Sequence, residues 1–141
     1  AGATFNIYRN LELALALGEP MWKPGWSAGP AHTGFWYRYR VPQLREDGTL
    51  DPLSIPPIAD TMPPALVRKL GPHHERLLMP SLDLTIYFVE PARSEWILVE
   101  SFAERARAGY STGSANLWDE RGRLVARASQ TMTLRKRKPR A

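Results

Sequence analysis

The sequence predicts an α+β domain in which one helix packs against an antiparallel sheet. One strand pattern precedes a single helix pattern, and four more strand patterns follow with hairpin-like connections. The 141 residues are enough for one hydrophobic core, and 43% hydrophobic and 23% charged residues are typical of a globular domain. We therefore expect a single two-layer domain.

Residues 1–33 are predicted to be an N-terminal connector or edge segment. Leucines at alternate positions from Leu11 to Leu17 fit a strand, but the Ala and Leu content fits a short helix equally well. Residues 18–30, GEPMWKPGWSAGP, contain three prolines and three glycines, which indicate a non-helical connector. Gly34–Val41 then reads as a strand with Phe35, Tyr37, Tyr39 and Val41 on one face.

The helix is predicted over residues 58–70. Pro63 and Pro64 fit only its first turn, where amide hydrogens are unpaired, so the helix should begin near Asp60 to Met62 and end at Gly71-Pro72. The four later strands are predicted at residues 82–88, 95–108, 110–118 and 124–135. Gln130 falls in the apolar phase of the last strand, so it should face the helix or a neighbouring subunit.

Composition narrows the classes of function. No apolar run approaches the roughly 20 residues that span a bilayer, and no signal peptide is expected at the N-terminus. The absence of cysteine excludes disulfides and thiolate chemistry, and makes a reducing cytoplasm the default compartment. His32 is isolated and His73 and His74 are adjacent, so no metal site is expected.

The net charge of +5 is concentrated at the C-terminus. Five basic residues lie there: Arg135, Lys136, Arg137, Lys138 and Arg140. We interpret residues 136–141 as a solvated basic tail, although such a tail can also attract nucleic acid, anionic lipid or phosphorylated molecules. Because no basic stripe with interleaved aromatics enters the body of the chain, a dedicated nucleic-acid module is not expected.

Three polar residues in apolar surroundings are the candidate site: Asp60, Ser81 and Gln130. Each has a structural alternative: Asp60 as a helix N-cap, Ser81 as a strand-entry hydroxyl, and Gln130 as a partner of a backbone group. Asp83 is the rival carboxylate. No G-x-S-x-G elbow surrounds Ser81, so a serine-hydrolase site is not favoured.

The segment from about Gly34 to Arg135 resembles the C-terminal hotdog repeat of type II acyl-CoA thioesterases, the TesB-like group. Three stretches carry the resemblance: IADTMPPAL, MPSLDLTIYFVEP followed by EWILVE, and RGRLVARASQTMTLR. It implies a hotdog fold, in which the sheet wraps the helix, for residues 34–135. It also implies hydrolysis of fatty acyl-CoA by a water that Asp60, Ser81 and Gln130 activate, with no metal or redox cofactor.

The chain departs from the TesB-like pattern in two ways. Family members usually carry two hotdog repeats, whereas this chain has room for one, so we expect a homo-oligomer or a missing N-terminal half as partner. Ser81 stands where Thr is more familiar, and both supply a hydroxyl. The competing hypothesis is a non-catalytic hotdog module that binds an acyl chain or completes an oligomer. A hotdog dehydratase is disfavoured because its catalytic His at the helix is absent.

Overall fold

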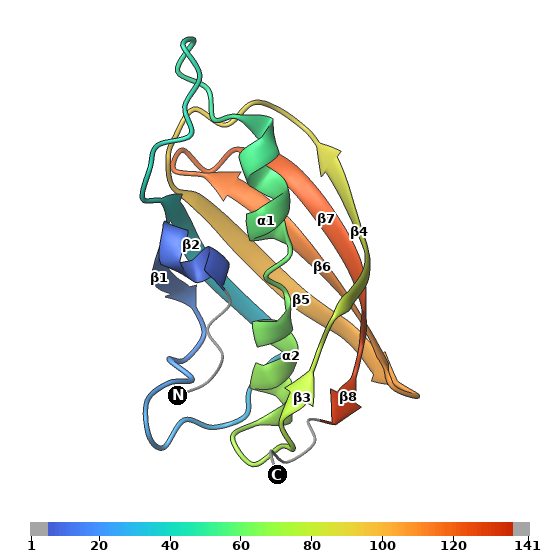
Figure 1. Cartoon of the computed structure of the whole chain (residues 1–141). Coiled ribbons are helices and arrows are strands. Elements are labelled where there is room, and N and C mark those ends of the chain that lie inside the picture. Colours follow the sequence, from blue (N-terminus) through green and yellow to red (C-terminus); the bar gives the residue numbers. More distant parts are fainter. Residues whose placement is uncertain (1–5, 137–141) are drawn as a thin grey trace.

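The computed structural model describes residues 6–136 and shows a six-stranded antiparallel sheet curved around a helical layer (Figure 1). The strand order is β1-β2-β5-β6-β7-β4. The elements are η1 (Asn6–Asn10), β1 (Leu11–Leu17), β2 (His32–Tyr39), η2 (Pro52–Ser54), α1 (Ile55–Ala59), α2 (Pro63–Leu70), β3 (Leu77–Leu78), β4 (Ser81–Phe88), β5 (Ile97–Arg107), β6 (Tyr110–Asp119), β7 (Leu124–Thr133) and β8 (Arg135–Lys136). This confirms the predicted α+β class and the hotdog arrangement.

The helical layer differs from the predicted single helix. It begins at Ile55 and consists of α1 and α2, which follow one another across the sheet with a break between them (Figure 1). Pro56 and Pro57 occupy the first turn of α1, as Pro63 and Pro64 occupy the first turn of α2. The sequence prediction missed α1 because it allowed for only one proline-tolerant first turn. Gly71, with a φ of 82°, ends α2 as predicted.

The strands follow the predicted patterns with shifted ends. Leu11–Leu17 is a strand, β1, which pairs with β2 at one edge of the sheet. The strand predicted at 34–41 covers His32–Tyr39 instead, and Val41 lies beyond it with 71% of its surface exposed. Two short strands were not predicted. β3 and β8 form a separate ribbon near the end of α2, in which Arg135 and Lys136 are paired with Leu78 and Leu77 (Figure 1). The rest of the predicted basic tail lies outside the described residues.

The core lies between the helices and the concave face of the sheet. Its buried side chains come from every layer: Leu11, Tyr37, Ile55, Ile58, Met62, Ile97, Val99, Leu117, Val125 and Ala128 are among them. Complete burial of one such Leu, Ile or Val contributes about 1.5–3 kcal/mol, so this layer supplies most of the stability of the domain. No helix within residues 6–136 is long and apolar enough to cross a membrane.

The connector between β1 and β2 is attached to α2 by Arg68. The Arg68 Nη1 donates to the carbonyl of His32 at 2.8 Å, and the Gly29 N–H donates to the Arg68 carbonyl at 3.0 Å. A Cβ at Gly18 would lie 2.6 Å from Arg68 Nη1, and one at Gly29 would lie 2.9 Å from Arg68 Nε. The two glycines therefore leave room for the guanidinium.

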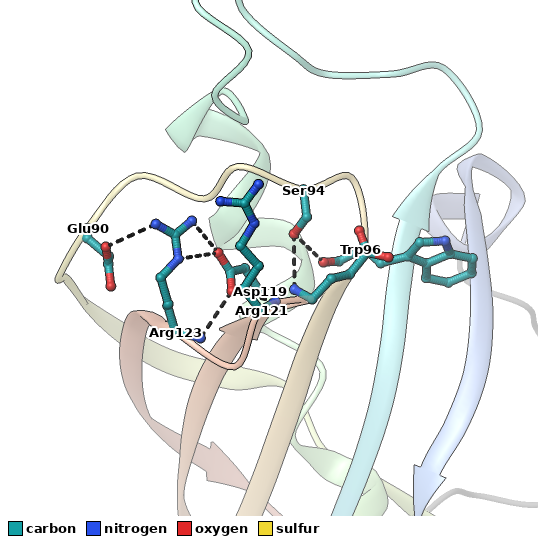
Figure 2. A network of polar contacts seen from close by, with 7 residues as sticks. Glu90, Ser94, Trp96, Asp119, Arg121 and Arg123 are labelled. Atoms are coloured by element: carbon teal, nitrogen blue, oxygen red, sulfur yellow. Dashed lines mark hydrogen bonds and ion pairs between the residues drawn. The ribbon is translucent and has the colours of Figure 1, made fainter.

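A buried carboxylate closes the β6–β7 hairpin. Asp119 is 1% exposed and accepts the N–H groups of Arg121 and Arg123 at 2.9 and 3.0 Å (Figure 2). The Arg123 guanidinium donates to its second oxygen at 2.9 and 2.6 Å, and also lies near Glu90. Burial raises the pKa of Asp119, but the hydrogen bonds from Arg123 and Arg121 outweigh it and hold the pKa below 3.8.

We predict that Asp119→Asn lowers the free energy of unfolding at pH 7 by roughly 2 kcal/mol, because hydrogen bonds to a charged group are lost. Since the folded-state pKa is lowered, this stabilisation is present above the ordinary pKa and is lost as the pH falls through the folded-state value. Urea unfolding of both proteins between pH 2.5 and 7 measures the difference. Glu104→Gln, at an exposed position, is the control. A difference that does not shrink in acid would contradict the prediction.

Candidate active site

Asp60 lies in the break between the two helices. It is the residue that follows α1, and its side chain is exposed. The N-cap position of α2 is Met62, which makes no side-chain cap bond. The alternative interpretation of Asp60 as the helix N-cap is therefore wrong. Because Pro63 and Pro64 have no amide hydrogen to donate, the carboxylate of Asp60 is not used at the first turn of α2.

Ser81 and Gln130 are brought to Asp60 by neighbouring strands. Ser81 is the first residue of β4, an edge strand, and is paired with Met132 of β7. Gln130 lies on β7, opposite Leu84 of β4 and Gly113 of β6. It is 2% exposed and faces the helical layer, as its place in the apolar phase predicts. The three candidate residues, far apart in the sequence, therefore meet at one point.

The three side chains form a closed hydrogen-bonded triangle. The Ser81 hydroxyl donates to Asp60 Oδ1 at 2.8 Å. The Gln130 Nε2 donates to Ser81 Oγ at 2.7 Å and also to Asp60 Oδ1. Asp60 Oδ1 thus accepts two hydrogen bonds, whereas Oδ2 accepts none from the described side chains. The triangle fixes the carboxylate and leaves one oxygen available to a bound water or substrate.

The rival carboxylate Asp83 does not join this triangle. Its Oδ1 accepts the N–H of Thr131 at 2.9 Å, beside the irregularity in the β4–β7 register. The histidines also lie elsewhere: His32 is paired with Glu100 at 2.9 Å, and His74 contacts the Gly71 carbonyl. In the described part of the chain, no three His, Asp or Glu residues are grouped as a metal site.

Two tyrosines near Asp60 were missed by the sequence reasoning. Burial raises the pKa of Tyr8, and the charge of Asp60 raises it further. Burial likewise raises the pKa of Tyr37 far above 10, although its hydrogen bond with Thr61 lowers it in part. Both phenols therefore stay neutral. Tyr37 shares one face of its predicted strand with Phe35 and Tyr39. The alternation of residues in a strand does not show that Tyr37, or Tyr8 of η1, lies near the helix break.

A glycine allows the helix break to approach the sheet. Gly113 is paired with Gln130, and a Cβ at this position would lie 3.0 Å from the Phe102 carbonyl oxygen and 3.5 Å from Met62 Sδ. Met62 is fully buried and follows Asp60 by two residues. The absence of a side chain at Gly113 thus leaves room for Met62 to pack on the sheet beside Gln130.

The chain also matches the model of a known protein family. The family model described as "Acyl-CoA thioesterase C-terminal domain" matches residues 1–134. The chain belongs to this family. The predicted resemblance to acyl-CoA thioesterases is confirmed at this level. A comparison with curated proteins finds no match.

Solved thioesterase structures resemble the whole domain. A candidate thioesterase from Novosphingobium aromaticivorans is 30% identical with a TM-score of 0.65, and 90% of this chain covers 44% of that one. Acyl-CoA thioesterase II TesB2 from Mycobacterium marinum is 22% identical with a TM-score of 0.70, over 94% of this chain and 51% of that one. The chain therefore spans about half the length of these two proteins.

A smaller relative aligns over nearly its full length. A hypothetical thioesterase from Streptococcus pneumoniae, solved with coenzyme A, has a TM-score of 0.67 at 12% identity, over 91% of this chain and 89% of that one. The S. pneumoniae protein and TesB2 are both less than 25% identical to this chain, so their likeness shows only a shared fold.

We predict that Gly113→Ala lowers the free energy of unfolding by about 1 kcal/mol, because the new methyl group would lie 3.0 Å from the Phe102 carbonyl oxygen and the β5 backbone must shift. Since Gly113 is paired with Gln130, the same shift should move Gln130 relative to Asp60. Thermal unfolding measures the stability, and a crystal structure of the variant measures the Asp60–Gln130 separation. Ser114→Ala, the next residue on the outer face of β6, is the matched control. An unchanged melting temperature and an unmoved Phe102 carbonyl would contradict the prediction.

Proposed function

We propose that the chain hydrolyses acyl-CoA thioesters to a free acid and CoA, with a catalytic group made of Asp60, Ser81 and Gln130. The observation that carries this proposal is the closed triangle of these side chains, in a member of the acyl-CoA thioesterase C-terminal domain family. Membership of the TesB-like type II group is part of the proposal. It is supported by the likeness to TesB2, an acyl-CoA thioesterase II.

In the proposed reaction, Asp60 is the general base. Its Oδ1 is held by Ser81 and Gln130, so Oδ2 takes the proton from a water. The water oxygen forms a bond to the thioester carbonyl carbon, and the carbonyl oxygen gains negative charge. When the tetrahedral intermediate collapses, the carbon–sulfur bond breaks and the CoA sulfur leaves with the proton from Asp60. In this proposal Ser81 orients the base through its hydrogen bond and is not the nucleophile.

Backbone amides beside Asp60 are the proposed stabilisers of the oxyanion. Among the described residues, the N–H groups of Thr61 and Met62 have no backbone acceptor. They stand at the N-terminal end of α2, the positive end of its dipole, directly after the base. Donors aimed at the oxygen where charge develops are worth about 3–4 kcal/mol of barrier in other acyl-transfer enzymes.

A second hotdog unit is the proposed partner, with residues 34–135 as the unit that carries the catalytic group. The site opens next to β4, an edge strand whose backbone has no neighbour on one side. Phe88 is paired with Ala126 on the inner face, yet it is 55% exposed. Leu82 and Val89 are also exposed on this strand or directly after it. Another copy of this chain, or a separate half, would cover these side chains and complete the acyl pocket.

We predict that Asp60→Asn lowers kcat by about 10²–10⁴-fold, because the general base is lost. Gln130→Ala should lower it by roughly 10–100-fold, because a hydrogen bond to a charged group is removed. Thiol release from an acyl-CoA chain-length series measures both. Asp83→Asn is the matched control, since its carboxylate binds only a backbone amide. Wild-type rates in both variants would refute the site. An absence of turnover with intact acyl-CoA binding by calorimetry would favour the non-catalytic module instead.

We predict that Phe88→Lys weakens association, because a charge on the inner face of the edge strand must be desolvated when a second unit covers it. Sedimentation velocity of the full chain should show a shift towards monomer, with at least a tenfold weaker dimer and a matching loss of activity. Val41→Lys, which replaces another exposed apolar side chain away from β4, is the control. Equal association of the two variants would exclude β4 as the contact.

A further inference from the structure

Two buried polar atoms lie beside the catalytic triangle without a hydrogen-bond partner among residues 6–136. They are the hydroxyl oxygen of Ser111 and the amide oxygen Oε1 of Gln130. Ser111 is 1% exposed and Gln130 is 2% exposed. A buried polar atom without a partner is unfavourable, because it has lost its hydrogen bonds to water. Neither atom is used by the proposed catalytic group.

The sheet register makes the two residues neighbours. Gly113 of β6 is paired with Gln130 of β7, and Ser111 is paired with Met132. Ser111 and Gln130 are therefore diagonal neighbours on the same concave face. Such positions lie about 7–8 Å apart between Cα atoms, which is within reach of a long side chain. Gly113 has no side chain to block the path between them.

The chemistry of the two atoms is complementary. With Nε2 directed at Asp60 and Ser81, Gln130 must direct its acceptor oxygen away from β4. A serine hydroxyl rotates freely and can donate its proton to an amide oxygen. The two atoms share no direct hydrogen bond in the structure, so a single water that accepts from the Ser111 hydroxyl and donates to Gln130 Oε1 would satisfy both atoms at once.

We propose that Ser111 is a positioning residue, whose hydroxyl binds Gln130 Oε1 through one bound water and holds the amide with Nε2 towards Asp60 and Ser81. The catalytic consequence rests on the proposed function. In the resting site, the negative charge of Asp60 itself favours this orientation of the amide. When Asp60 takes the proton from water, that attraction falls, and Ser111 becomes the group that prevents the amide from flipping before the product leaves.

Nuclear magnetic resonance tests the contact without any need for turnover. The sequence contains only two glutamines, Gln43 and Gln130, so labelling glutamine with ¹⁵N gives two side-chain amide pairs. Gln43→Glu assigns them. We expect Ser111→Ala to shift the Gln130 pair and reduce the separation of its two protons, as the amide gains freedom. Ser114→Ala, on the outer face of the same strand, should leave it unchanged. An unmoved Gln130 pair in Ser111→Ala overturns the inference.

Kinetics tests the catalytic role separately. We expect Ser111→Ala to lower kcat by about tenfold with KM unchanged, the effect of one net hydrogen bond. Its melting temperature should fall only slightly, because a single hydrogen bond is lost. Ser111→Thr, which retains the hydroxyl, should restore kcat. Equal kcat in Ser111→Ala and Ser114→Ala overturns the positioning role. If the wild type hydrolyses no acyl-CoA, the proposed function fails, while the amide spectrum still decides the contact.

Discussion

The break in the helical layer is the constraint on which the site depends. Pro63 and Pro64 cannot accept the hydrogen-bonding pattern of a helix interior, so α1 must end and α2 must begin within three residues. Asp60 is one of these three residues, and its carboxylate reaches Ser81 and Gln130 from the break between the helices. The buried Met62 packs beside Gly113, and the Asp60 carboxylate accepts a hydrogen bond from Gln130 on the strand next to it. The prolines fix the position of the break, Gly113 leaves room for it on the sheet, and the buried amide of Gln130 binds the carboxylate that lies in it.

Much of the fold could be predicted because its strands alternate clearly. Ile97, Val99 and Ser101 are buried on the inner face, as period two predicts. The predicted helix and strand ends are wrong where tertiary packing overrides the local sequence preference. The predicted helix begins after Pro56 and Pro57, yet these prolines lie in the first turn of α1. Leu134 continued the apolar phase of the last strand, yet the chain leaves β7 there and pairs again as β8. Only tertiary contacts decide such positions.

The candidate site was predictable in its members but not in its connections. A polar residue in an apolar phase identified Gln130, and the resemblance to a family joined it to Asp60 and Ser81. The direction of each hydrogen bond depends on the β4–β7 register and on the height of the helix break, which no spacing in the sequence encodes. Ser111 shows this limit most clearly. It falls within a predicted strand, but its lack of a hydrogen-bond partner among residues 6–136 is a property of the packed structure.

The anchoring of the connector by Arg68 couples the motions of two segments that are far apart in the sequence. The guanidinium binds the first residue of β2, and the Arg68 carbonyl binds Gly29, so the connector cannot lift without disturbing the last turn of α2. Amide hydrogens in the two segments should therefore exchange with solvent as one cooperative opening unit. Such an opening would release the start of β2, the strand that joins β1 to the rest of the sheet within residues 6–136. Arg68 thus links the stability of the last turn of α2 to that of this side of the sheet.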